Sequence, residues 1–211
     1  FSATMPPEIE ALIKDFMTDP VTVQIGERSQ AAKTISHRFV SVRPDQKTDL
    51  LQDLLQDEDG KVLIFVKRKV GAERLGRDLK RAGLPADSIH GDKSAESRHV
   101  VLQAFTRGRI RHLVATDVAA RGIDVDDVDL VLNYDLPMSV EDYIHRAGRS
   151  GRAGRRGAAL SMIEPRDRPM YEAISAHLKG EQAPPGAGRA GAGRSGGGRS
   201  GGGRSGGSGR G

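Results

Sequence analysis

Residues 62–82 read VLIFVKRKVGAERLGRDLKRA, a run of five apolar residues followed by a segment with helical spacing. The apolar run, Val62 to Val66, predicts a strand that is buried on both faces, because a strand with one wet face alternates apolar and polar residues. The segment Arg68 to Ala82 predicts a helix that Gly83 and Pro85 end. A buried strand that leads into a helix is typical of β-α-β units, so this stretch favours a parallel sheet.

The same alternation of apolar runs and helical patterns continues along most of the chain. Ser94 and Ser139 are expected to cap two helices, the second with Asp142 at its third position. The helix after Ser94 is expected to bury one face made of Val100, Val101, Ala104 and Phe105. Outside residues 62–82, strands are expected at 35–42, 112–116, 130–134 and 157–163, and helices at 46–56, 94–108, 139–147 and 168–178.

These elements predict an α/β fold, with one doubly wound, mostly parallel sheet and helices on both faces. Residues 30–180 suit a single domain of about 150 residues. Residues 1–29 are expected to be the end of a preceding domain plus a linker, with a helix around Glu8 to Met17. The N-terminus has no initiator Met and no signal-peptide pattern, so we expect it to be a cut inside a longer protein.

Residues 181–211 differ in composition from the rest of the chain, because they consist largely of Gly, Arg and Ser repeats. A segment with so few apolar side chains cannot offset the entropy of ordering, so we expect a disordered tail. The segment from Ala183 onward holds five Arg and no acidic residue, which accounts for the whole net charge of +5. Residues 1–182 are therefore charge-balanced, and any polyanion site on the domain must be a local cluster.

Composition also excludes several kinds of site. The chain contains no Cys, so disulfides and thiolate metal sites are excluded, and a reducing, cytoplasmic location is expected. The six His residues are scattered without ligand-like spacing, so no metal site is expected. No run of about eighteen apolar residues occurs, so no membrane span is expected.

Residues 143–152, YIHRAGRSGR, place basic side chains beside two glycines. On the helix that includes these residues, His145 and Arg149 share a face with Asp142, opposite an apolar stripe. The glycines let the backbone turn, which would bring Arg152 near Arg149. Two guanidinium groups held in this way can fork onto phosphate oxygens, where charge gathers during phosphoryl transfer. The alternative is a solvated basic loop in which Arg149 pairs with Asp142.

Residues 113–124, LVATDVAARGID, form a buried strand that ends in a polar loop. Ligands of open parallel sheets bind at such strand ends. Thr116 can donate its hydroxyl to a phosphate, Gly122 allows close backbone approach, and Asp124 can accept from a ribose hydroxyl. The alternative is an ordinary strand-to-helix turn that Asp117 caps.

Residues 90–98, HGDKSAESR, contain a glycine turn that leads into a helix N-terminus. The backbone N–H groups of such a terminus can bind an anion, and Arg98 could reach a backbone phosphate. The alternative is that Arg98 is a surface residue paired with Glu96 or another neighbour.

These three segments, with VLIFVK at 62–67 and SAT at 2–4, resemble in order and spacing the C-terminal motifs of DEAD-box RNA helicases. The resemblance extends from residue 1 to about residue 179, and the matches ATDVAARGID and HRxGRxGR are highly specific together. It implies that residues 30–180 are the second RecA-like domain of an ATP-dependent RNA helicase. Residues 1–29 would then end the first RecA-like domain.

The resemblance implies a nucleotide site that two domains share. Arg149 and Arg152 would be arginine fingers on the γ-phosphate of ATP, and Gly122 and Asp124 would contact the nucleotide. The first domain would hold Mg²⁺. The present sequence contains neither a phosphate loop nor an Asp-Glu-Ala-Asp box, so the chain alone is not expected to hydrolyse ATP.

The resemblance also implies contacts with RNA and with the first domain. Arg98 and Thr116 would bind the RNA backbone, with low sequence specificity. His145, with Ser2 and Thr4 of the SAT motif, would couple the two RecA-like domains.

The sequence departs from the family pattern at a few positions. Ala95 stands where the family usually has Gln, which removes one polar group near the expected RNA-binding segment. Ala147 and Ser150 replace common family choices with other small residues, and little effect is expected. The acidic run at 57–59 precedes a buried strand instead of following one, so we interpret it as a solvated loop.

Other functions stay open from the residues alone. The chain could be an RNA-binding module without catalysis, a docking platform for a protein partner, or part of a related superfamily-two DNA helicase. The basic tail could tether RNA electrostatically, or it could be a solubilising linker without a partner.

Overall fold

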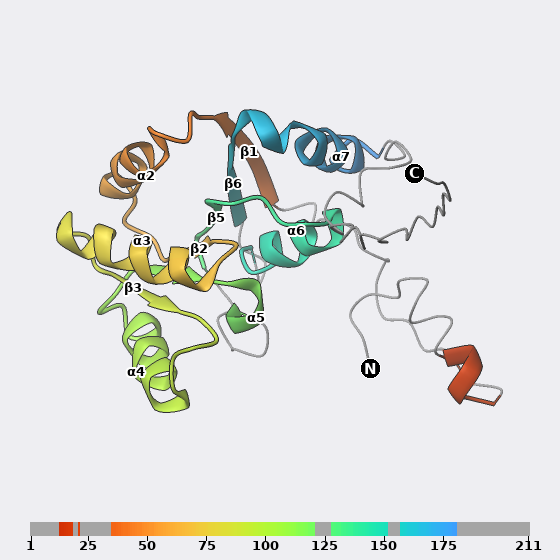
Figure 1. The fold of residues 1–211 in the computed structure, drawn as a ribbon, viewed down its shortest axis with the longest axis horizontal. Helices are drawn as coiled ribbons and strands as arrows, with labels where there is room; N and C mark the ends of the chain where they lie inside the picture. Colours follow the sequence, from red (N-terminus) through yellow and green to blue (C-terminus); the bar gives the residue numbers. More distant parts are fainter. Residues whose placement is uncertain (1–12, 19–20, 22–34, 121–127, 152–156, 181–211) are drawn as a thin grey trace, which may run out of the picture.

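Six parallel strands form one sheet within the residues that the computed structural model describes, which are 13–18, 21, 35–120, 128–151 and 157–180. The strand order is β1-β6-β5-β2-β4-β3 (Figure 1). The strands are β1 (Ile35–Ser41), β2 (Val62–Phe65), β3 (Ala86–Ile89), β4 (His112–Ala115), β5 (Leu130–Asn133) and β6 (Gly157–Ile163). The predicted fold class is confirmed, and the sheet is entirely parallel in this part of the chain.

The five helices predicted from periodicity in the domain are present within one or two residues, whereas the short helical segments at 117–120 and 165–167 were not predicted. The helices are α2 (Lys47–Gln56), α3 (Lys69–Arg81), α4 (Ala95–Thr106), α5 (Asp117–Ala120), α6 (Val140–Ala147) and α7 (Arg168–Leu178), with a 3₁₀ turn η1 (Pro165–Asp167) before α7. Both predicted N-caps are confirmed. The Ser94 hydroxyl accepts from the N–H of Ser97, and the Ser139 hydroxyl accepts from the N–H of Asp142, each at 3.1 Å.

Alternate side chains of the central strand β2 face two separate cores. Val62 and Ile64 pack with apolar residues of α2 and α3, whereas Leu63 and Phe65 pack with residues of α4 and α5. Helices α6 and α7 pack together in a third apolar cluster beside β1 and β6. Both sides of β2 are therefore dry, which explains its unbroken apolar run.

Two further details differ from the sequence predictions. Val100 is 60% exposed, because α4 buries the narrow stripe that contains Val101 and Phe105 and turns the neighbouring position to solvent. Strand β3 was not expected, because Asp87 and Ser88 interrupt any apolar run. It forms by pairing in parallel with β4. Because β3 is an edge strand of the described sheet, it pairs with a strand on one side only.

The order of the strands reverses beside β2. From β2 the chain builds β3 and β4 on one side and then crosses to β5 and β6 on the other. The carboxyl ends of β4 and β5 flank that of β2, because Phe65 pairs in register with Ala115 and with Asn133. Such a switch point opens a crevice at the carboxyl edge of a parallel sheet, where ligands of α/β folds bind.

The two flanking regions of the predicted domain division are largely beyond the described residues. Of the helix expected around Glu8 to Met17, residues 13–17 are described, and residues 13–16 of these are helical. The boundaries at residues 29 and 180 stay predictions. None of the described helices is both long enough and apolar enough to cross a bilayer.

Candidate functional site

A small hollow lies at the switch point, between the short helix α5 and the face of α6. Phe65, which ends β2, is one of its lining residues. The other lining residues come from α5 and from α6 with the turn that follows it, and they are Asp117, Ala120, Asp142, His145, Arg146 and Arg149. The hollow therefore joins the two most specific sequence motifs, which are separated by about twenty residues in the chain.

The predicted face of α6 is the face that lines this hollow. His145 and Arg149 lie there together with Asp142, as the helical spacing predicted. The Asp142 carboxylate accepts from the Ser139 hydroxyl at 2.9 Å, which fixes it to the start of the helix. The main chain of Arg149 is held at both ends, since its N–H donates to the carbonyl of Arg146 and its carbonyl accepts from Val128. The position of Arg149 is therefore set by the fold.

The two predicted RNA-contacting residues lie near the same end of β4. Thr116 directly follows the strand, and only 6% of it is exposed. Arg98 on α4 is half-buried, and its Nη2 lies 3.5 Å from the carbonyl oxygen of Ala119 in α5. Arg98 thus packs toward the Thr116 end of the sheet, whereas its role toward RNA stays a prediction.

Five predicted site residues lie outside the described residues, and they are Ser2, Thr4, Gly122, Asp124 and Arg152. The two glycines near Arg152 differ in conformation. Gly151 has a φ of 71°, in the left-handed region that favours glycine, so the turn expected there is present. Gly148 is the C-cap of α6 with a φ of −66°, which other residues adopt readily.

Arg146 is the residue of this site that the sequence analysis missed. It is 3% exposed, and its guanidinium group makes four hydrogen bonds. Nε and Nη2 form a fork on the two carboxylate oxygens of Asp117, at 2.6 and 2.7 Å. Nη1 donates to the side-chain oxygen of Asn133 at 2.9 Å and to the main-chain oxygen of Asp135 at 2.7 Å. The group also lies 4.7 Å from the centre of the Phe65 ring.

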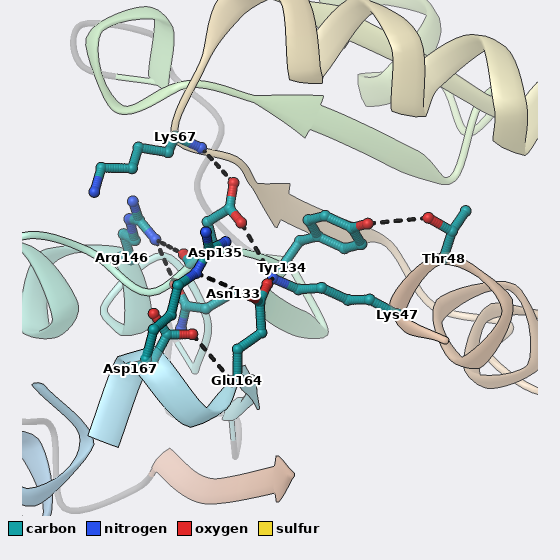
Figure 2. Close-up of polar contacts among 10 residues, drawn as sticks. Lys47, Thr48, Lys67, Asn133, Tyr134, Asp135, Arg146, Glu164 and Asp167 are labelled. Carbon is teal, nitrogen blue, oxygen red and sulfur yellow. Dashed lines mark hydrogen bonds and ion pairs between the residues drawn. The ribbon is translucent and has the colours of Figure 1, made fainter. Parts of the chain in front are cut away.

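Arg146 therefore holds α6 against three neighbouring strand ends at once. Figure 2 shows its contacts with Asn133 and Asp135. Asp117 follows β4, Asn133 ends β5, and Phe65 ends β2. Forked, charge-assisted pairs of this kind are geometrically strict. Two features of the sequence could have indicated this pair. Arg146 is a basic residue on the buried side of α6, directly after His145, and Asp117 is an acid close behind a buried strand.

A second polar cluster surrounds the HGD segment. His90 Nε2 lies 3.1 Å from Glu73 Oε2, and the Ser88 hydroxyl donates to the same oxygen. Hydrogen bonds from His90 and then Ser88 lower the pKa of Glu73 to about 2. Lys69 donates to Asp92 at 2.6 Å, and this bond lowers the pKa of the Asp92 carboxyl. These pairs anchor α3 to the turn that leads into α4.

The described residues contain no cluster of three His, Cys, Asp or Glu that could hold a metal ion. A wider groove, of about 930 Å³, lies away from the hollow, between α2 and α7 at the end of β1 and β6. The sequence motifs do not line it, so we place the candidate site at the hollow despite its smaller size.

The comparisons with known proteins agree with this geometry. Residues 46–154 match the family model of the helicase conserved C-terminal domain. The chain is 43% identical over 164 residues to the ATP-dependent RNA helicase DbpA of Bacillus subtilis (strain 168), covering 77% of this chain and 34% of that protein. It thus spans about a third of the length of this curated relative.

Two solved structures show the same fold. A DEAD box protein from Methanococcus jannaschii superposes with a TM-score of 0.66 at 38% identity, over 85% of this chain and 48% of that one. The C-terminal domain of the DEAD-box protein Dbp5 superposes with a TM-score of 0.65 at 33% identity, over 71% of this chain and 88% of that domain. With its parallel sheet, its motifs at the switch point and these matches, the chain belongs to the family of C-terminal helicase domains of DEAD-box proteins.

Proposed function

We propose that this chain acts as the second RecA-like domain of an ATP-dependent RNA helicase, in which Arg149 and Arg152 complete an ATP site held by a first RecA-like domain. ATP and RNA bind across the cleft between the two domains. Closure of the cleft brings the guanidinium groups to the γ-phosphate, and the same closure bends the RNA so that short duplexes separate.

The observation that carries this proposal is the position of Arg149 in the hollow at the switch point. Its main chain is fixed on both sides, and the neighbouring Arg146 ties the same helix to Asp117 and Asn133. These contacts fix the backbone that carries the Arg149 guanidinium group, which reduces the reorganisation needed when charge develops on a transferring phosphoryl group. An arginine finger contributes about 10³–10⁵ in rate in phosphoryl-transfer enzymes.

The carboxylates of the hollow are engaged within the domain. Asp117 holds Arg146, and Asp142 accepts from Ser139. These residues fit a site that supplies cations to a triphosphate, and we propose that the first domain supplies the ligands of Mg²⁺. Gly122 and Asp124 would contact the nucleotide, and His145, Ser2 and Thr4 would couple the two domains.

RNA is the proposed second ligand. Arg98 reaches the carbonyl of Ala119 in α5, and Thr116 directly follows β4, so a guanidinium group and a hydroxyl at this end of the sheet can both contact backbone phosphates. The five Arg of the tail would add affinity without sequence preference. A cytoplasmic location is proposed as well, since a chain without Cys suits a reducing compartment.

The decisive experiment is Arg149→Ala in a protein that joins this chain to its first domain. RNA-stimulated ATP turnover should fall by about 10³-fold or more, because the finger stabilises charge in the transition state. RNA affinity should stay within about twofold of the parent protein. Arg168→Ala is the matched control, since Arg168 is an exposed arginine of the same domain that pairs with Glu172 on α7.

The control variant should retain full turnover. Unchanged turnover in Arg149→Ala would refute the assignment of the finger. Turnover that is absent from the joined parent protein itself, together with measurable RNA binding, would favour the alternative of an RNA-binding module without catalysis.

A further inference from the structure

Lys47, the first residue of α2, is unusual because it is 3% exposed. Lysine is almost never buried to this extent unless its charge is paired. Its ammonium group lies 2.5 Å from the carboxylate of Glu164, which is also buried, and 3.2 Å from the carboxylate of Asp135. The Tyr134 ring lies 4.5 Å from the same nitrogen. Figure 2 shows Lys47 extending from α2 across the ends of β5 and β6 to reach these acids.

Asp135 is the point at which this buried charge meets the candidate site. Its carboxylate accepts from Lys47 and, through its other oxygen, from the main-chain N–H of Lys67 at 2.9 Å. Its own N–H donates to the carbonyl of Phe65. Its carbonyl oxygen accepts from Nη1 of Arg146 at 2.7 Å. Both the side chain and the backbone of Asp135 are therefore fixed, and its carbonyl is held toward Arg146.

The contacts form one continuous chain from α2 to the hollow. Lys47 binds Asp135, Asp135 binds Arg146, and Arg146 clamps Asp117. Arg149 lies three residues after Arg146, in the turn that ends α6, and its N–H donates to the Arg146 carbonyl. A shift of Asp135 would thus be passed to the backbone that carries Arg149.

We propose that Lys47 is a positioning residue for the phosphate-facing arginines. It acts through Asp135 and Arg146 and does not touch the nucleotide. This inference rests on the proposed function. It assigns an effect on catalysis to Lys47, which belongs to α2 and lies outside the hollow. A displacement of about 1 Å, produced far from the chemistry, can cost about 100-fold in rate.

The competing explanation is that Lys47 serves stability alone. Removing one partner of a buried ion pair destabilises the fold, whereas removing both partners together is often tolerated. Without Lys47, Glu164 would keep one cation, the exposed Arg166 at 2.9 Å. The two explanations therefore diverge when the charge of Glu164 is removed together with that of Lys47. Stability should then recover, but Asp135 would still lack the cation that holds it.

The test uses the joined two-domain protein and compares Lys47→Met with the double variant Lys47→Met/Glu164→Gln. For Lys47→Met we expect a lower melting temperature and a kcat for RNA-stimulated ATP hydrolysis that is lower by about tenfold or more, within the loss that misplacement can cause. The KM for ATP should stay within about twofold. For the double variant we expect the melting temperature to recover while kcat stays low. Lys80→Met is the matched control, because Lys80 is a half-exposed lysine that pairs with Asp87 on the far side of the domain.

Recovery of kcat together with the melting temperature in the double variant would overturn the proposal, as would a kcat of Lys47→Met within twofold of the parent. If these variants fold poorly, Asp135→Asn decides. It keeps the Lys47–Glu164 pair and an oxygen for Lys67, and it should lower kcat severalfold with little change in melting temperature. An unchanged kcat in Asp135→Asn would refute the role. If Arg149→Ala left RNA-stimulated ATP turnover unchanged, that result would instead refute the proposed function itself.

Discussion

Replacing Arg146 with Met would remove the guanidinium group that ties α6 to the ends of β4 and β5, while a chain of similar length would still cover the Phe65 ring. We expect this change to lower the free energy of unfolding by about 3–5 kcal/mol, the range found when one partner of a buried pair is removed. Arg146 is 3% exposed, so water cannot readily replace its donors when they are lost.

The contributions follow from the burial of each partner. Asn133 is fully buried, and a buried acceptor left without a donor costs about 1–3 kcal/mol. The bond to the Asp135 carbonyl is part-buried, so the loss of this donor costs less. The Asp117 side chain is 33% exposed, so water can satisfy part of its carboxylate and its contribution is smaller. One buried acceptor, one part-buried acceptor and part of a charge therefore account for the expected total.

The assay is urea unfolding followed by circular dichroism at neutral pH. With a slope of about 2 kcal/mol/M, the midpoint should move down by roughly 1.5–2.5 M for Arg146→Met. Arg168→Met, in the exposed pair with Glu172, should leave the urea midpoint unchanged within error. A midpoint shift below about 0.5 M for Arg146→Met would refute the view that this residue fastens the site.

Three further predictions concern stability and the tail. Burial lowers the pKa of His112 to about 4, so the unfolded chain binds a proton more readily between about pH 4 and 6.5. The unfolding free energy should therefore rise with pH across this window by about 3 kcal/mol, and urea midpoints of His112→Gln should lose most of this rise. Val101→Ala should cost about 2 kcal/mol in urea unfolding, whereas Val100→Ala on the exposed side of α4 should change stability by less than about 0.5 kcal/mol. Deleting residues 181–211 should make the slope of log affinity for single-stranded RNA against log salt shallower by about 3.5, since five Arg would each release counterions; an unchanged slope would favour a linker without a partner.

The strands and helices that could be predicted from the sequence are those with a clear local pattern. The five apolar residues from Val62 made a doubly covered strand evident, and Ser94 and Ser139 marked the starts of two helices. Strand β3 lacks such a pattern, because Asp87 and Ser88 take two of its four positions. Its formation depends on pairing with β4, which is about twenty-five residues away and not encoded locally.

The candidate site was predictable in outline and not in its internal support. Local spacing placed His145 and Arg149 on one face of a helix, and the structure brings them to the expected edge of the sheet. The burial of Arg146 depends on Asp117, which lies 29 residues earlier, and on Asn133. The burial of Lys47 depends on Glu164, which lies 117 residues later. A charged residue is expected to be solvated as long as its distant partner is unknown. The burial of Arg146 and Lys47 was therefore not predicted from the sequence.

The most direct test of the two-domain account is ATP turnover measured with and without RNA, on the 211-residue chain alone and on the protein that joins it to a first RecA-like domain. We predict that the chain alone gives no turnover above background, and that the joined protein hydrolyses ATP faster when RNA is present. ATP hydrolysis by the chain alone, or turnover in the joined protein that does not respond to RNA, would contradict a shared site completed by Arg149.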